Sequence, residues 1–498
     1  RGADVNAVDR WRGTPLRDAE AGEHTETVAF LKRVGAVNRR SASSLIDTPD
    51  SLSRSRSSAS LSSPTKLRTA RIADSQRRTE VPGAADRTMT SCTRIPPFPL
   101  SAANPLLEEA KAALAQPLLS PEALDSLYCA CTSLRRWIHA NPEPGFEEKK
   151  TNALLRSMLT TLADIPESAF SDCAGTGLVI DIKGRGPKSS SSLADKVKTV
   201  ALRADMDALP LLEETDDAFF PDALKSAKPG LMHACGHDGH VAMLLGAAKL
   251  LKRHESSLNG TVYLAFQPAE EGGAGARRML EDGLASIEPP FETAFALHNW
   301  PYPETPSGTV GTRAGTIMAG SGSYEIAVEG AGGHAAVPHK NVDVVVCGAA
   351  VVTALQTIVS RRVDPLDSVV VSTTVFRAGG AASNVMADAA TLAGTFRALD
   401  KKTFEWLHGA IEETARHAAG THGCAVAVDF APAKDGVTRE EYPPTVNDPG
   451  AAGFAGEMAR EVLGGGDANV REVAPVMPAE DFSFFGELAP SAMMWLGS

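Results

Sequence analysis

The pattern of apolar and polar positions becomes that of a globular protein at about residue 105 and stays so to the end of the chain. Short β-rich runs alternate there with longer amphipathic runs that have the period of a helix. The first block of predicted elements consists of strands at 197–203, 261–266 and 293–297 and helices at 241–252 and 276–281. This alternation favours an α/β fold, in which helices cover the faces of a sheet.

A second block of elements follows with its own order. Its predicted strand, helix, two strands, helix and strand occupy 323–329, 341–360, 368–376, 390–397, 402–418 and 424–430. The order βαββαβ is the ferredoxin-like arrangement, which indicates a separate small domain inserted into the first. The first sheet then resumes, with a helix near 449–463 and an apolar run at 492–496.

The N-terminal stretch carries an internal repeat. The run Gly2–Asn6 returns, one residue shorter, as Gly35–Asn38, an offset of 33 residues that is the period of an ankyrin repeat. Residues 1–38 thus resemble the α-helical end of an ankyrin array, with an unrelated helical hairpin as the alternative. Because a lone repeat cannot bury its own apolar face, we expect either more repeats upstream, which would bind a protein partner, or a loosely attached piece.

Residues 39–104 are dominated by serine and arginine and hold hardly any aromatic residues. Such a composition cannot bury enough apolar surface to offset the entropy lost on ordering, so it predicts a disordered linker. The alternative is an arginine-serine tail that binds nucleic acid or becomes phosphorylated.

Composition and charge narrow the classes of function. With 43% hydrophobic and 22% charged residues and a net charge of -12, the chain has no general attraction to nucleic acid or to an anionic membrane. Its seven cysteines include no C-x-x-C pair, which favours a reducing compartment such as the cytoplasm over a disulfide framework. We find no apolar run of the ~20 residues that a membrane span needs. The chain begins at Arg1 without a recognisable signal peptide.

Five polar clusters come just after predicted strands, where the ligands of open α/β sheets collect. They are 203–210, with Asp205 and Asp207; 232–240, with three histidines and Cys235; 266–273, with Glu270 and Glu271; His298; and 332–339, with His334 beside two glycines. Each has a structural alternative: a solvated turn, a buried cysteine among surface histidines, a solvated acidic loop, a core histidine and a glycine-rich hairpin, respectively.

The residue types in these clusters are those of a metal-dependent hydrolase. A thiolate and a neutral imidazole are good ligands for zinc-like or manganese-like ions. Two adjacent carboxylates repel each other, so the pair Glu270 and Glu271 indicates a cation nearby. One carboxylate of such a pair can bind metal while its neighbour takes a proton from water.

In this order, the clusters resemble those of the amidohydrolase branch of the aminoacylase and carboxypeptidase-like metallopeptidases, which includes hippurate hydrolases and plant auxin-conjugate hydrolases. The resemblance extends over roughly 120–498 and includes the opening run Arg135–Glu143. It implies a mixed-sheet metallopeptidase catalytic domain at 105–312 and 426–498, with an inserted dimerisation lid domain at 313–425. The implied reaction is metal-dependent hydrolysis of the amide bond of a small N-acyl amino acid by a homodimer.

The resemblance also assigns roles at the metal site. It implies one or two divalent ions per subunit, manganese or zinc, held by Cys235, His237, Glu271 and His298. Glu270 would be the general base, and Asp207 would be a supporting carboxylate near the metals.

Three further residues receive roles toward the substrate. His334 resembles the lid histidine that reaches across a dimer to stabilise the oxyanion, and Asn384 resembles a polar group that helps there. Arg397 resembles the arginine that clamps the substrate carboxylate, and 478–483 resembles the last acidic loop of the family.

At the C-terminus the sequence departs from this pattern. The resemblance leads us to expect a further metal-binding histidine after the final core strand, yet the chain ends at Ser498 with no histidine beyond His422. We therefore expect this sequence to be a fragment, inactive if the last ligand is missing. Two other functions stay open: a catalytically silent scaffold that binds through its ankyrin repeats, and a metallo-carboxypeptidase that acts on short peptides.

Overall fold

The computed structural model describes residues 121–186, 198–215, 224–434, 437–438 and 440–498. The ankyrin-like stretch at 1–38 and the serine- and arginine-rich linker at 39–104 lie outside the described residues. All described residues belong to one compact unit, Arg87–Ser498.

An eight-stranded mixed sheet confirms the predicted α/β fold. Its strand order is β1-β2-β4-β3-β5-β18-β6-β17, in which β4, β3, β5 and β18 are parallel neighbours. These strands are β1 (Phe170–Cys173), β2 (Gly177–Lys183), β3 (Lys198–Asp205), β4 (Gly260–Gln267), β5 (Thr293–Trp300), β6 (Val310–Thr312), β17 (Val470–Glu472) and β18 (Ser491–Gly497).

Helices bury both faces of this sheet. Along β4, Leu264 and Phe266 belong to one apolar cluster, while the alternate residues Tyr263 and Ala265 belong to another. Successive side chains of a strand point to opposite faces, so each cluster marks one side of the sheet. The first cluster contains side chains of α4 (Pro121–Ala140), α5 (Lys149–Thr161) and α6 (His237–Arg253), and the second those of α8 (Gly275–Glu281) and α12 (Ser483–Leu488).

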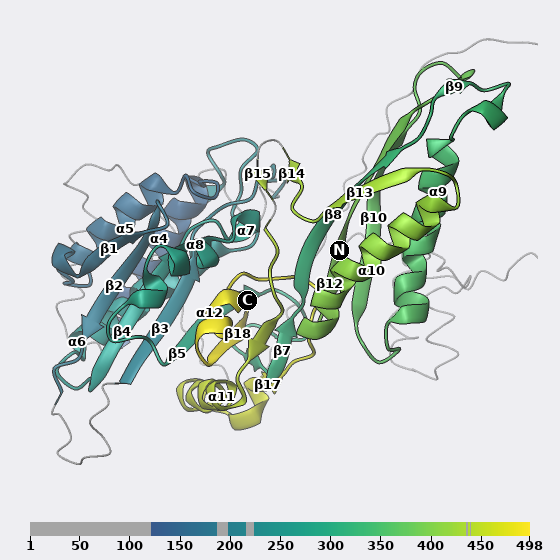
Figure 1. The fold of residues 1–498 in the computed structure, drawn as a ribbon. Coiled ribbons are helices and arrows are strands. Elements are labelled where there is room, and N and C mark those ends of the chain that lie inside the picture. The colour runs from purple at the N-terminus through teal and green to yellow at the C-terminus, as the bar shows by residue number, and fades with distance from the viewer. Residues whose placement is uncertain (1–120, 187–197, 216–223, 435–436, 439) are drawn as a thin grey trace, which may run out of the picture. The chain divides into compact units, whose positions relative to one another are not determined.

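A second sheet, called the lid here, has the predicted order βαββαβ. Its elements are β8 (Gly320–Glu329), α9 (Val344–Thr357), β10 (Val369–Ala378), β12 (Ala389–Ala398), α10 (Lys401–Gly420) and β13 (Ala425–Asp429). The four strands are antiparallel in the order β10-β12-β8-β13, and Figure 1 shows α9 and α10 along the sheet. Burial alternates along β8, because one face of the sheet packs on these helices.

Paired strands carry the chain into the lid and back. β7 (Gly315–Met318) precedes β8 and pairs antiparallel with β16 (Thr445–Asn447), while helix α11 (Pro449–Leu463) follows β16. The backbone of Ser321, at the start of β8, exchanges two hydrogen bonds with that of Tyr442, at 2.9 and 3.0 Å. The strands β7 and β16, called the crossings here, therefore lie side by side where the chain enters and leaves the lid.

The sequence analysis missed β1, β2 and the short strands β6, β7, β16 and β17. The last four have only three or four residues, too few to show a period of two. Burial along β1 does not alternate, so this edge strand carries no clear pattern either.

The expectation that no apolar run reaches membrane-span length does not hold for one segment. Among the described residues, the helical run Val344–Arg362, 19 residues long, is apolar and long enough to cross a membrane by those two criteria. A helix that packs on a sheet passes the same test. Here Val344, Cys347, Val351 and Leu355 are buried in the lid core.

Leu155 of α5 is fully buried, so the variant Leu155→Ala should lower the free energy of unfolding by about 2–5 kcal/mol. The matched control Leu366→Ala removes a side chain that is 93% exposed and should change it by less than about 0.5 kcal/mol. Urea unfolding followed by circular dichroism measures both. Equal losses for the two variants would contradict the packing described here.

Candidate active site

Parallel strands bring the acidic clusters to one edge of the large sheet. Asp205 ends β3, and Glu270 and Glu271 follow β4 by three and four residues. Since β4, β3 and β5 are parallel neighbours, their carboxyl ends meet at the same edge. His298 was expected after a strand but lies within β5, two residues before its end at Trp300.

Cys235 and His237 reach this edge by a different route. The expectation that their cluster follows a strand is wrong, because His237 is the first residue of α6 and Cys235 lies in the loop before it. Between them, Gly236 has φ 87°, a backbone conformation that favours glycine. A Cβ at Gly236 would lie 2.5 Å from the Asn299 side chain, so the helix start packs closely on β5.

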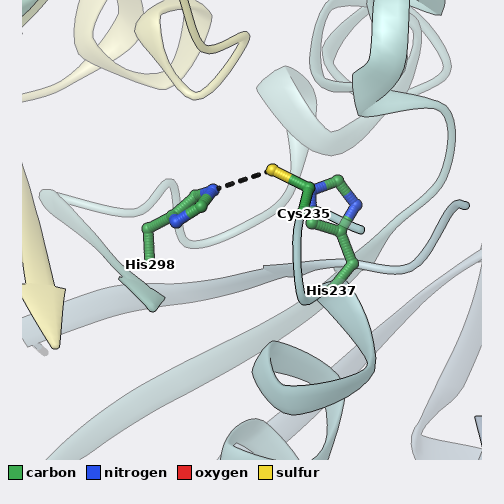
Figure 2. A group of neighbouring side chains, drawn as sticks. All are labelled: Cys235, His237 and His298. Atoms are coloured by element: carbon green, nitrogen blue, oxygen red, sulfur yellow. Dashed lines mark hydrogen bonds between the residues drawn. The ribbon is translucent and has the colours of Figure 1, made fainter. Parts of the chain in front are cut away.

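The proposed metal ligands form two groups that share His237. The ligand atoms of Cys235, His237 and His298 lie within 4.8 Å of one another, and so do those of His237, Glu270 and Glu271. Figure 2 shows the first group, with Cys235 Sγ 3.4 Å from His298 Nε2. The structure therefore gathers all four predicted ligands and the predicted base around one imidazole.

His237 presents a buried nitrogen that suits a cation. Its Nδ1 lies 3.2 Å from Asp207 Oδ1, so in the neutral ring the proton stays on Nδ1 and the lone pair is on Nε2. In the described part of the chain, Nε2 is buried without a hydrogen-bond partner. The nearest oxygens, from Asp205, Glu270 and Glu271, lie at 3.6, 3.9 and 4.0 Å, too far for hydrogen bonds. A thiol, two imidazoles and carboxylates around such an atom fit a zinc-like or manganese-like ion.

The surroundings favour a positive charge on His237 Nε2, carried by a proton or by a metal ion, and keep His298 neutral. Burial lowers the pKa of His237, but Asp205 and the hydrogen bond to Asp207 outweigh it and raise that pKa well above its usual value. Burial and the neighbouring His240 lower the pKa of His298 to about 3, so this ring is neutral. The Nδ1–H of His298 donates to the Asn299 carbonyl at 2.7 Å, which leaves its Nε2 lone pair directed toward Cys235.

Asp207 is placed to position the site and not to bind metal. Its Oδ1 accepts hydrogen bonds from His237 Nδ1 and the Glu270 amide, at 3.2 and 3.0 Å. Its Oδ2 accepts from the Glu271 amide at 3.0 Å. Asp207 thus joins a proposed ligand on α6 to the turn that carries the two glutamates.

That turn, α7 (Glu270–Gly273), lies between two residues with positive φ, Ala269 at 50° and Ala274 at 49°. Burial raises the pKa of Glu270 well above its usual value, and the nearby Glu480 and Asp481 raise it further. Burial also raises the pKa of Glu271 to about 7. Crowded acidic groups with raised pKa values are typical of catalytic and metal sites.

Several functional residues were missed by sequence reasoning or left without a role. His240 lies with Nδ1 2.5 Å from Asp205 and Nε2 2.7 Å from the Asn299 side chain, and its ring is 4.5 Å from that of His298. Its nitrogens thus face protein groups, which makes it a support for the site. A histidine one helical turn after His237 faces the same side, and that spacing is the signal that could have identified it.

Arg203 is a second missed residue. It is buried and donates to Asp205, Glu480 and Asp481 at 2.7, 2.8 and 2.8 Å. Gln267 accepts from it at 2.7 Å. An arginine directly after the apolar run Val200–Leu202 was the signal in the sequence, since such a residue is rarely buried unless paired.

The lid carries the three predicted substrate residues at its two ends. His334, in β9 (Gly333–His334), pairs with Val385 of β11 (Val385–Met386), and the Asn384 carbonyl accepts from the Ala335 amide at 3.0 Å. His334 follows the end of β8 that is about 30 Å, ten strand residues, from β7 and β16, and Asn384 lies beside it just before β11. The structure therefore brings His334 and Asn384 together but places neither beside the metal ligands.

Arg397 lies at the opposite end, beside the crossings. Its Nη1 donates to the Met477 carbonyl at 2.8 Å. With Val370, Met477, Pro478 and Ala479 it lines an open cavity of about 410 Å³. This end of the lid adjoins the acidic loop that holds Glu480 and Asp481.

Comparisons with known proteins show which family the chain belongs to. Residues 201–498 match the family described as peptidase family M20/M25/M40. The IAA-amino acid hydrolase ILR1-like 4 of Arabidopsis thaliana is 41% identical over 366 residues, 73% of this chain and 76% of that protein. The hippurate hydrolase of Campylobacter jejuni is 38% identical over 380 residues, 76% of this chain and 90% of that protein.

A solved structure shows a similar fold. The Bacillus subtilis YXEP protein, described as a dinuclear metal binding peptidase from the M20 family, is 29% identical with a TM-score of 0.60. The similarity covers 75% of this chain and 90% of that one.

The raised pKa of Glu271 predicts how stability depends on pH without metal. Its pKa is about 7 in the folded chain and near 4.5 unfolded, so the folded state binds more protons between these values. Stability of the metal-free chain should therefore fall as pH rises from about 4.5 to 7. Thermal melts should show a shallower fall for Glu271→Gln.

Added zinc or manganese should raise the melting temperature of the wild type at pH 7 more than that of Glu271→Gln. Identical metal-induced shifts in the two proteins would exclude Glu271 as a ligand.

Proposed function

Since this chain belongs to peptidase family M20/M25/M40 and is thereby a metal-dependent hydrolase, we propose that it cleaves the amide bond between an acyl group and an amino acid. The observation that supports the proposal most directly is that His237 Nε2 is buried without a hydrogen-bond partner. Thiol, imidazole and carboxylate groups that can bind a metal surround it, and Glu270 is one of its neighbours. Relatives named for IAA-amino acids and hippurate support an N-acyl amino acid as the substrate.

The proposed roles at the metal centre follow from the donor set. Cys235, His237, Glu271 and His298 would hold one or two divalent ions. When bound, such ions lower the pKa of a water molecule and polarise the amide carbonyl. Glu270, 3.9 Å from His237 and with a raised pKa, would accept the proton of the attacking water and return it to the leaving amine.

Arg397 would bind the free carboxylate on the amino-acid part of the substrate. A guanidinium has five N–H donors, and the one hydrogen bond described for Arg397 uses a single nitrogen, toward Met477. The remaining donors match a carboxylate bidentately. The cavity of about 410 Å³ beside this side chain has room for a small substrate.

We also propose that the lid, taken as 313–425 between the catalytic segments 105–312 and 426–498, forms the dimer. His334 follows β8 at the end remote from the crossings, so a partner subunit is the natural source of this histidine for each site. The edge strand β10 and exposed apolar residues such as Val346 and Phe376 support pairing there. Asn384 would accompany His334 across the interface.

A carboxypeptidase acting on short peptides is the second candidate. The thermostable carboxypeptidase 2 of Saccharolobus solfataricus is 37% identical over 371 residues, 73% of this chain and 85% of that protein. Parallel assays with dipeptides and N-acyl amino acids separate the two functions, because a general carboxypeptidase would prefer the former.

The variant Glu270→Gln should keep its metal and lose turnover by about 100-fold or more, because the amide keeps the shape of the side chain but cannot accept a proton. Elemental analysis and hydrolysis of N-acyl amino acids measure the two properties. The neighbouring variant Glu271→Gln should instead lose metal. A Glu270→Gln protein without metal, beside a Glu271→Gln protein with it, would reverse the two assignments.

A shared site predicts complementation between two inactive variants. Mixed dimers of His334→Ala and Glu270→Gln subunits contain one site with both groups intact, so about a quarter of wild-type activity should return on random pairing. Exchange of differently tagged subunits is the control. An inactive mixture despite proven exchange would mean that each chain works alone.

A further inference from the structure

The side chain of Tyr442 spans the turn that carries both glutamates. Tyr442 is 6% exposed, and its hydroxyl donates to the Glu270 carbonyl at 2.5 Å. The same hydroxyl accepts from the Ala274 amide at 3.2 Å. One hydroxyl therefore joins Glu270, the first residue of α7, to Ala274, the residue that follows α7.

This turn needs such external support. Ala269 and Ala274 bound it at φ 50° and 49°, conformations that residues with a Cβ rarely adopt and that persist only where the surroundings hold them. Asp207 holds one side through the amides of Glu270 and Glu271. Tyr442 holds the other side through the Glu270 carbonyl and the Ala274 amide, so the glutamates are fixed from two directions.

The two residues before Tyr442 connect the turn to other parts of the fold. Glu440 forms ion pairs with Arg277 at 2.5 Å and Arg278 at 3.3 Å, both on α8 directly after the turn. Glu441 pairs at 2.9 Å with His408, on the lid helix α10. With its backbone bonded to Ser321 of β8, Tyr442 thus lies where the lid is attached.

We propose that Tyr442 is a positioning residue for the general base and transmits the placement of the lid to it. This inference rests on the proposed role of Glu270 and adds the means by which that carboxylate is held. Loss of the hydroxyl frees one side of the turn, so Glu270 samples unproductive orientations. Because Tyr442 shares a three-residue segment with Glu441, a change at the lid contact reaches the same hydroxyl.

The variant Tyr442→Phe, made in the whole 498-residue chain, tests whether Tyr442 positions the general base. Hydrogen–deuterium exchange of the amides at 270–275 should become at least about 10-fold faster, since the hydroxyl no longer restrains them. For an N-acyl amino acid, kcat should fall roughly 10- to 100-fold while KM and metal content stay near wild type, because geometry and not binding is lost.

Tyr263→Phe is the matched control. Tyr263 is 4% exposed and its hydroxyl donates to the Pro289 carbonyl at 2.8 Å, away from the turn. This variant therefore also loses a hydrogen bond from a tyrosine hydroxyl to a backbone carbonyl. It should leave exchange at 270–275 and kcat unchanged. Unaltered exchange at 270–275 in Tyr442→Phe, as in this control, would overturn the positioning role. A wild-type chain that hydrolyses no N-acyl amino acid would overturn the proposed substrate instead, and the exchange comparison would still decide the role of Tyr442.

The variant Glu441→Gln tests whether the lid acts on the turn that carries the two glutamates. With Tyr442 intact but its neighbour released from His408, exchange at 270–275 should still become faster. Glu413→Gln is the control, because it removes another α10 ion pair, the one with Arg362 at 2.7 Å. If both variants exchange at the wild-type rate, the lid does not act on the turn.

Discussion

The structure depends on a surplus of negative charge gathered at one edge of the large sheet. Asp205, Asp207, Glu270 and Glu271 lie beside His237, and Glu480 and Asp481 lie beside Glu270. Arg203 is the buried guanidinium that contacts Asp205, Glu480 and Asp481. An unpaired carboxylate is expensive to bury, so it either takes up a proton or finds a cation. The raised pKa values of Glu270, Glu271 and Asp481 show how strongly the site draws positive charge. Bound divalent ions would balance this negative charge, and their binding would then contribute to the stability of the fold.

Much of the fold could be predicted from the sequence, because it follows from local patterns of apolar and polar residues. The strands β3, β4 and β5 and the lid strand β8 have clear patterns, and their carboxyl ends or pairing partners follow from topology rules. The route of Cys235 to the site was not predictable in this way. It depends on a glycine with positive φ before α6 and on close packing against Asn299, neither of which leaves a periodic signal.

The supporting residues of the site were harder to predict because their partners are distant in sequence. Arg203 contacts Glu480 across 277 positions, and Tyr442 reaches Glu270 across 172. No local pattern marks such pairs, although each lies beside a motif that is visible on its own. The three proposed substrate residues of the lid show the opposite limit. A family resemblance suggested them, but only the topology shows that Arg397 and His334 lie at opposite ends of β8 and β12.

The paired crossings β7 and β16 also determine where the lid tolerates change. A domain attached by two hydrogen-bonded strands resists twisting and sliding, and an added residue in either strand shifts the register and turns its side chains to the wrong face. The segment between β10 and β11 is not part of these paired strands, and a Cβ at Gly380 meets no neighbour. Gly379, with φ 80°, should be kept. A reporter domain or an affinity loop grafted into that segment would enlarge the lid and leave its attachment intact.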